Sequence, residues 1–439
     1  MRSKNIQMIL LAICLYSISC SDYLNEKPDK STTTINSTKD LQSILDNLTL
    51  SYDALLTAGS DEYYLTKSTY DSRSQLDRNI YTWEANTDNI EAWAKIYSYV
   101  YRANIVITEI KRFKQEKEYD YLMGQGLFLR AFAFYIGSQL YCTPYSKNAS
   151  NELGLPLRVL PDVEVSFARS TLKETYDRMI SDLKTSEQLL LNSEFALNRG
   201  NHKSVLGLLA RIYLSMRDYE NALKYSSLYL KESRTLLDYN SINETSNPAF
   251  QIENPETTFY TLVDGFPATS FIVDTSLYDL YNDNDLRKVI FYYNGTNGEI
   301  KYKGSYNGRS GYTTFYGITT SEILLIHAES AIRMGEQETA LDDLNYLLSN
   351  RYKHGTFTKI TEDDRSKLLK IALMERRKEL AFRGLRWSDV RRLNLEGQNI
   401  SLSRLIGNEV FTLPPNDLRW TWLIPSEAII LNKWEQNRR

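Results

Sequence analysis

Apolar residues recur at helical spacing along most of this chain, and no other feature constrains its fold as strongly. Between residues 89 and 112, apolar side chains beginning with Trp93 return every three or four positions and form one stripe. The stretch 121–145 repeats the pattern, with Gly124 and Gly126 on or beside the packing face. Because glycine lets backbones approach closely, we expect both glycines to pack against the helix of Trp93.

Two later segments carry the pattern of a tetratricopeptide repeat, which is a helix, a tight turn and a second helix. In residues 202–230, Tyr213 and Ala222 stand where the first and second helix of such a repeat place them. The segment 325–351 has Ala340 at the position that matches Ala222. The two segments lie far apart, so we expect paired helices that are interrupted by large insertions rather than a regular tandem array.

The regions between and after these helices have a different composition. Residues 239–316 are rich in Asn, Gly, Ser and Tyr, with short alternating runs that predict strands, and residues 393–439 form a similar loop-rich tail. We therefore predict a mainly α-helical fold, an irregular tetratricopeptide-like scaffold over about 39–235 and 317–392 that holds a loop-rich subdomain with short strands. Long inserts on a rigid scaffold are where binding functions usually sit.

The amino end predicts export. Arg2 and Lys4 precede an apolar stretch, residues 8–18, which is too short to span a bilayer and has the layout of a secretory signal peptide. A cysteine, Cys20, follows the apolar stretch and is succeeded by polar chain. This layout predicts a lipoprotein signal over residues 1–19, with Cys20 lipidated as the first residue of the mature chain.

Two alternatives for the amino end stay open. Cys14 fits the usual Leu-x-x-Cys box better than Cys20, but processing there would leave an apolar segment that is too short to work as a signal. The other alternative is secretion without a lipid. If Cys20 carries the lipid, the single domain 20–439 has Cys142 as its remaining thiol, so no intramolecular disulfide can form and Cys142 is expected to be a small buried hydrophobe.

Composition and motifs argue against several functional classes. The 52 basic and 55 acidic residues give a net charge of -3, which offers no electrostatic reason to expect nucleic acid as a partner. Only three histidines and three cysteines are present, and zinc-helix, nucleophile-elbow, phosphate-loop and Cys-x-x-Cys motifs are missing. We expect no enzyme, no metal and no cofactor, and the histidines are interpreted as structural. The sequence singles out no carboxylate pair for glycoside hydrolysis.

Two patterns remain that bear on packing and binding. Tyrosine is abundant, with 32 residues, and suits either aromatic-lined binding surfaces or wet helix-packing surfaces. In the basic segment 375–393, Glu375, Glu379 and Asp389 stand at helical distances from arginines and a lysine. This spacing predicts an internal salt-bridge network around Trp387 rather than a phosphate-binding or membrane-binding surface.

Taken in order, several motifs resemble one family, the SusD/RagB nutrient-uptake lipoproteins of Bacteroidetes-type outer membranes. The resemblance runs the length of the chain, with two departures: Arg383 stands where the family usually has Glu, and the chain is short for the family. The motifs are CSDYLNEKP, WAKIYSYVYRANIVI, GLFLRAFAFYIGSQLYCTPY, GLPLR, RSTLKETYDRMISDLKTSEQLL, HKSVLGLLARIYLSMRDYENALKYS, EILLIHAESAIRMGEQETALDDLN, ERRKELAFRGLRWSDVRRL and LIPSEAIILNKWEQN.

The resemblance implies four irregular tetratricopeptide units with a loop-rich subdomain on one side. It also implies a lipid-anchored protein on the cell surface, here at Cys20, which acts as a lid on a SusC-like TonB-dependent outer-membrane transporter and captures oligomeric nutrients. Such proteins are not enzymes. Their glycan-specific members stack aromatic side chains on sugar rings and reach hydroxyl groups with polar side chains.

On this basis we expect an oligosaccharide ligand that is held by aromatic and polar side chains of the loops, with Trp83 the first candidate. Trp420 and Trp422 are interpreted as structural. The aromatic candidates are Tyr70, Tyr81 and Trp83 before the first helical pair and Phe266, Tyr306, Tyr312 and Tyr316 in the insert. The polar candidates are Asp71, Arg73, Asn86 and Arg309.

Three other functions stay open at this point. An oligopeptide binder could have the same architecture, since a surface rich in tyrosine and loops suits peptides as well. A tetratricopeptide protein-interaction scaffold without a small ligand is a more remote alternative. An unrecognised glycosidase is more remote still.

Overall fold

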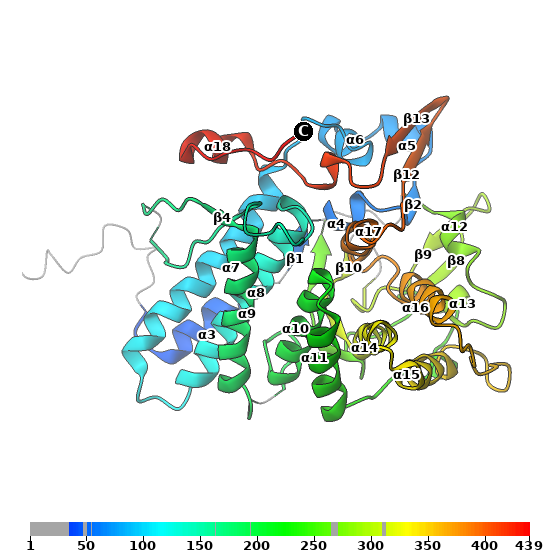
Figure 1. Cartoon of the computed structure of the whole chain (residues 1–439), viewed down its shortest axis with the longest axis horizontal. Helices are drawn as coiled ribbons and strands as arrows, with labels where there is room; N and C mark the ends of the chain where they lie inside the picture. The colour runs from blue at the N-terminus through cyan, green and yellow to red at the C-terminus, as the bar shows by residue number, and fades with distance from the viewer. Residues whose placement is uncertain are drawn as a thin grey trace, which may run out of the picture.

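Helices that pack side by side make up most of this computed structural model (Figure 1). It describes residues 35–46, 51–53, 55–162, 164–193, 195–264, 271–309 and 313–439. The expected mainly α-helical class, with short strands in the insert, is confirmed. The predicted signal peptide with Cys14 and Cys20 lies outside the described residues, and so do the candidates Phe266 and Tyr312.

The elements follow one another along the chain as two sets. The helices are α3 (Thr38–Asp46), α4 (Leu55–Ala58), α5 (Lys67–Asp71), α6 (Gln75–Tyr81), α7 (Ile90–Glu109), η2 (Ile110–Phe113), α8 (Tyr119–Tyr141), α9 (Leu172–Leu189), α10 (His202–Met216), α11 (Tyr219–Glu232), η3 (Tyr239–Ser241), α12 (Thr275–Tyr278), α13 (Arg287–Phe291), α14 (Thr320–Met334), α15 (Gln337–Ser349), α16 (Arg365–Glu379), α17 (Arg386–Asn394), η4 (Leu418–Trp420) and α18 (Ser426–Asn432). The strands are β1 (Ser51–Asp53), β2 (Tyr63–Tyr64), β3 (Leu153–Pro156), β4 (Arg169–Thr171), β5 (Thr257–Phe259), β6 (Leu262–Asp264), β7 (Ile272–Val273), β8 (Tyr292–Asn294), β9 (Ile300–Tyr302), β10 (Thr314–Phe315), β11 (Ile318–Thr319), β12 (Leu402–Ile406) and β13 (Glu409–Leu413).

The long helices form a row across the molecule. Helix α8 packs on α7 and α9, α10 packs on α11, and α14 packs on α11, α15 and α16, in the left-to-right order that Figure 1 shows. Polar side chains fix where these helices begin: Asn89 accepts a hydrogen bond from the backbone N–H of Ala92, and Thr319 accepts one from Glu322. Helix α14 ends at Gly335, whose φ of 90° suits glycine. The two predicted repeat-like pairs are therefore α10–α11 and α14–α15.

The two glycines of α8 pack against different neighbours. A Cβ on Gly126 would lie 2.9 Å from Ile107 of α7, which confirms the expected close approach to the helix of Trp93. Gly124 was expected to face the same helix, but a Cβ there would meet Leu190 at 2.7 Å, just after the end of α9. Helix α8 lies between two partners, so glycines two positions apart face opposite sides.

Short strands join the insert to the rest of the chain. In a three-stranded sheet, β6 pairs in parallel with β1 and antiparallel with β10, while β2 pairs with β7. The remaining pairs are β3 with β4, β5 with β11, the hairpin β8–β9 and the hairpin β12–β13. Segments that precede the helical scaffold are thus connected through backbone hydrogen bonds to the insert far along the chain.

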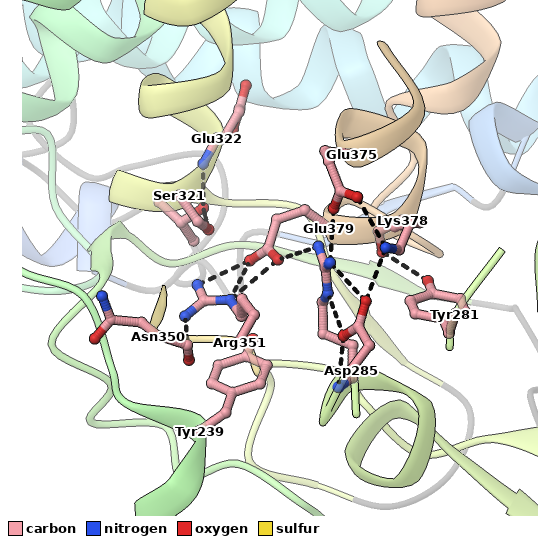
Figure 2. A network of polar contacts seen from close by, with 12 residues as sticks. Tyr239, Tyr281, Asp285, Ser321, Glu322, Asn350, Arg351, Glu375, Lys378 and Glu379 are labelled. Atoms are coloured by element: carbon pink, nitrogen blue, oxygen red, sulfur yellow. Dashed lines mark hydrogen bonds and ion pairs between the residues drawn. The ribbon is translucent and has the colours of Figure 1, made fainter. Parts of the chain in front are cut away.

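A buried ion network lies where the insert meets α15 and α16 (Figure 2). The Arg351 guanidinium is 2.7 Å from Glu256 and 2.9 Å from Glu379, and the Arg287 guanidinium is 2.6 Å from Glu375. Burial works to lower the pKa of Arg351, but the two carboxylates outweigh it and hold the pKa well above its usual value. These contacts confirm the predicted salt bridges of Glu375 and Glu379.

A second ion network surrounds Trp387 on α17. Asp389 lies 2.8 Å from Arg376 and 2.9 Å from Arg392, which also contacts Glu329 of α14 at 2.6 Å. The predicted internal network around the tryptophan is therefore confirmed. Arg383, which departs from the family pattern, instead stacks 4.0 Å from the centre of the Tyr306 ring and donates a hydrogen bond to Thr319.

Four of the predicted binding aromatics prove to be part of the core. Trp83 is 1% exposed, and its indole N–H donates to the Gly59 carbonyl at 3.0 Å. Tyr81 and Tyr316 are equally covered, and the Tyr306 hydroxyl is 2.5 Å from the Tyr239 hydroxyl. A sugar cannot stack on a ring whose faces are covered, so the expectation that these four side chains form a binding platform is wrong for this structure.

The ion network predicts a large loss of stability when its central cation is removed. In Arg351→Met, the buried carboxylates of Glu256 and Glu379 lose their partner, so we expect the free energy of unfolding to fall by about 3–5 kcal/mol. As a control, Lys67→Met breaks an exposed ion pair with Asp71 and should cost less than about 1 kcal/mol. Urea denaturation measures both. Equal losses in the two variants would contradict the role given to Arg351.

Candidate functional site

The remaining predicted site residues lie at the surface in three separate places. Tyr70 is half-buried in α5, and Arg73 follows the same helix. Asn86 is exposed beside the carboxyl-terminal tail, since Arg439 donates a hydrogen bond to the neighbouring Ala85 carbonyl. Arg309 is exposed in the insert, and the fourth polar candidate, Asp71, pairs with Lys67. No printed contact brings these residues together.

A cavity of about 520 Å³ lies where the end of α8, the end of α17 and the tail meet. We call it the tail pocket. Its lining comes from three segments that are far apart in the sequence. The lining residues are Thr143, Pro144, Ser146, Asn148, Asn151, Glu152, Leu153, Arg391, Asn394, Leu395, Asn416, Asp417, Leu418, Trp420, Thr421, Glu435, Asn437 and Arg438.

The first wall is the loop that follows α8. The helix stops at Cys142, because Pro144 disfavours helical backbone at the residue before it and cannot itself continue the hydrogen-bond ladder. The loop then folds back on itself through Glu152, whose carboxylate accepts hydrogen bonds from Thr143 Oγ1 at 2.9 Å and from Ser146 Oγ at 3.1 Å. Cys142 is buried, as expected, and burial raises the pKa of its thiol to about 11.

The second wall is the end of α17 with the tail. The Asn394 side chain pairs with both backbone groups of Ile400, which fixes the chain as it leaves α17. Asn437 donates from its amide to the Tyr141 carbonyl at 3.0 Å and to the Trp422 carbonyl at 2.7 Å. These two bonds hold the tail against the end of α8 and so close the pocket on that side.

Trp420 and Arg391 support the pocket from the protein interior. Trp420 is 3% exposed; its indole N–H donates to the Pro414 carbonyl, and its ring lies 4.6 Å from that of Trp387. The structural role expected for Trp420 and for Trp422, which is also buried, is therefore confirmed. Arg391 is buried and donates to the Gln139 and Cys142 carbonyls at the end of α8.

The lining groups suit a ligand with many hydroxyl groups. Asparagine is the commonest residue in the lining, and a side-chain amide offers both donors and an acceptor, as a sugar hydroxyl does. Asn148 and Asn151 are exposed at the rim, where the Asn151 amide donates to Asn148 at 2.9 Å. No side chain of the lining presents an exposed aromatic face, since Trp420 is covered. The pocket therefore favours hydrogen bonding over stacking.

Reasoning from the sequence missed this pocket because no single segment marks it. Asn416 and Asn437 stand in the tail, which we interpreted as packing, and Asn148 and Asn151 follow a helix that we interpreted as scaffold. The density of asparagine in loops that follow helix ends was the available signal. It would have named residues but not their meeting point, because hydrogen bonds such as that of Asn437 to Tyr141 span most of the chain.

His327 joins three helices in an arrangement that looks like a hydrolytic triad. Its Nε2 is 2.9 Å from Ser227 Oγ and its Nδ1 is 2.5 Å from Asp343 Oδ2. However, Ser227 lies inside α11 and also donates to the Leu223 carbonyl, and backbone N–H groups within a helix are used by helical bonds. Without donors for an oxyanion, we interpret this group as a packing contact among α11, α14 and α15.

Two further features were searched in the part of the chain that the structure describes. Among those residues, no group of three His, Cys, Asp or Glu side chains could hold a metal ion. Within the same ranges, none of the helices combines the length and the apolar character needed to cross a bilayer.

Comparison with protein families gives two matches. A SusD-like family, described as starch-binding and associating with the outer membrane, matches residues 22–214. The SusD family model, SusD_RagB, matches residues 240–422. Together the two models cover the helical scaffold, the insert and most of the tail.

Two curated proteins of Formosa agariphila are similar to the chain. SusD-like protein P38 is 24% identical over 241 residues, which are 50% of this chain and 44% of P38. SusD-like protein P2 is 22% identical over 391 residues, which are 74% of this chain and 73% of P2. The chain thus aligns with less than half of P38 and with about three quarters of P2.

Solved structures share the fold. A SusD superfamily protein from Bacteroides thetaiotaomicron superposes with a TM-score of 0.74 at 18% identity, covering 92% of this chain and 100% of that one. A SusD-like carbohydrate-binding protein from Bacteroides vulgatus gives a TM-score of 0.70 at 19% identity, covering 91% of this chain and 97% of that one. With the two family matches, this likeness of fold shows that the chain belongs to the SusD/RagB family.

Proposed function

We propose that this protein is a lipid-anchored binding protein of the outer-membrane surface that captures an oligosaccharide in the tail pocket. One observation carries the proposal: in a chain of this family, a pocket of about 520 Å³ is lined chiefly by amide and hydroxyl side chains. This volume falls within the range of roughly 300–1,000 Å³ that is usual for small-molecule sites.

The chemistry of the lining supports a sugar rather than an apolar ligand. A sugar hydroxyl both donates and accepts hydrogen bonds, and the exposed amides of Asn148, Asn151 and Asn416 can do the same from three sides of the pocket. Names of relatives agree with this class of ligand, since one matching family is described as starch-binding and the protein from Bacteroides vulgatus as carbohydrate-binding. The protein would bind its ligand without turning it over.

A glycan array with the lipid-free protein tests the proposal. We expect binding to at least one class of oligosaccharide, and we expect the double variant Asn148→Ala/Asn151→Ala to bind that class at least about tenfold more weakly, because each lost hydrogen bond is worth about 0.5–1.5 kcal/mol. The double variant Asn294→Ala/Asn297→Ala, at the exposed tip of the β8–β9 hairpin, is the control and should bind like the native protein.

The outcomes of this experiment separate the alternatives. Binding to peptides instead of glycans would favour the oligopeptide binder, and binding to neither would favour an interaction scaffold. Release of shortened sugars from a bound glycan would show an enzyme. Equal affinity of the native protein and the Asn148→Ala/Asn151→Ala variant would remove the tail pocket from the proposal.

The anchor and the partner are a separate part of the proposal. Family membership and the sequence around Cys20 support a lipid at this cysteine and transfer of the ligand to a SusC-like TonB-dependent transporter. When the tagged full-length protein is purified from detergent-solubilised outer membranes, we expect such a transporter to copurify. The Cys20→Ala variant should leave the membrane fraction, whereas Cys14→Ala should stay in it. Membrane retention of Cys20→Ala together with loss of Cys14→Ala would place the anchor at Cys14.

A further inference from the structure

Four arginines gather around the tail pocket without a carboxylate partner. Arg391 and Arg438 line the pocket. Arg169 donates to the carbonyls of Gly154 and Glu435, and Arg439 donates to three carbonyls, including those of the lining residues Leu418 and Thr421. In the part of the chain that the structure describes, none of the four arginines is in an ion pair.

The arginines around the pocket differ from those of the two ion networks in how their charge is balanced. Burial lowers the pKa of Arg391 to about 10 and that of Arg439 to about 10, and it also lowers the pKa of Arg169. In the networks, carboxylates overcome the same effect of burial and raise the pKa of Arg351 and of Arg392 well above the usual value. The charges beside the pocket are therefore partly desolvated but not neutralised by acids.

The carboxylates of the lining offset only part of this positive charge. Asp417 is paired with Arg419 in two contacts of 2.9 Å, so the two cancel each other. Glu152 is held by two hydroxyl groups, and Glu435 is exposed and in no ion pair among the described residues. Two unpaired carboxylates thus stand against four unpaired arginines.

The end of α8 compensates Arg391 in part. Arg391 donates to the last carbonyls of the helix, where the helix dipole places about half a negative elementary charge. This favourable contact explains how a guanidinium without an acid partner is tolerated in the interior. It does not cancel a full charge, and the Nε of Arg391 is buried without a hydrogen-bond partner. The pocket keeps an excess of positive charge at its inner wall.

We infer that the glycan of the tail pocket is anionic and carries carboxylate or sulfate groups that face Arg391 and Arg438. The inference rests on the proposed function and adds the class of sugar to it. An anionic oxygen accepts shorter and stronger hydrogen bonds from a guanidinium than a neutral hydroxyl does. A neutral glycan would leave these guanidinium charges uncompensated beside a ligand that has displaced their water.

Matched pairs of ligands test this inference by calorimetry with the native lipid-free protein. One pair is oligogalacturonate and its methyl ester, which differ in the carboxylate charge; the other is a carrageenan oligosaccharide and its desulfated form. We expect the acidic member of at least one pair to bind at least roughly tenfold more tightly than its neutral form. Raising NaCl from about 0.05 M to about 0.5 M should weaken the acidic ligand much more than the neutral one.

A charge variant shows whether the preference arises in the pocket. Arg438 is exposed, so Arg438→Gln should fold normally and lose most of the preference for the acidic ligand while keeping its affinity for the neutral form. The control is Arg112→Gln, an exposed arginine of η2 near the opposite end of α8, which should leave the preference unchanged. Circular dichroism confirms that both variants are folded.

The possible results distinguish failure of this inference from failure of the proposed function. If neutral glycans bind as tightly as their acidic partners, or more tightly, the protein binds glycans but the inference is overturned. If Arg438→Gln and Arg112→Gln lose the acidic preference equally, the preference does not come from the tail pocket, which also overturns it. If no glycan binds, acidic or neutral, both the inference and the proposed function fail.

Discussion

The buried ion network of Arg351, Arg287 and Glu379 is the contact on which the arrangement of the molecule depends. Arg351 follows α15, Glu379 ends α16, and Arg287 begins α13 in the insert. Arg351 also donates to the Leu237 carbonyl, which leads from α11 into the insert, so one guanidinium contacts three parts of the fold. Since burying an unpaired charge is costly, each partner is stable only when the others are in place. The network thus fixes the insert on the helical scaffold.

The same residue type has two uses in this protein, and the difference connects fold with function. Arginines such as Arg351 and Arg392 meet carboxylates and join elements that are far apart in the sequence. Arginines such as Arg391 and Arg439 meet only carbonyl groups, which position them but do not neutralise them. Those of the first kind build the frame. Those of the second kind surround the tail pocket and give it a charge that a ligand can use.

The sequence could predict the parts of this fold that local patterns encode. Helical periodicity located α7, α8 and the repeat-like pairs, and spacing within one segment identified the salt-bridge partners of Glu375 and Glu379. Exposure of an aromatic ring is different, because it depends on what packs over the ring. Trp83 stands in a polar segment, yet Arg404 from the distant β12 lies 5.0 Å from its ring centre and helps to cover it. The tail pocket could not be predicted for the same reason, since its walls meet only after folding.

The central claim is that the tail pocket, rather than the insert, receives the glycan. A crystal structure of the protein with a bound oligosaccharide tests it most directly. The account predicts ligand density within hydrogen-bonding distance of Asn151 on one wall and of Arg438 on the tail. Ligand density beside Arg309 in the insert, with the tail pocket free of sugar, would contradict it.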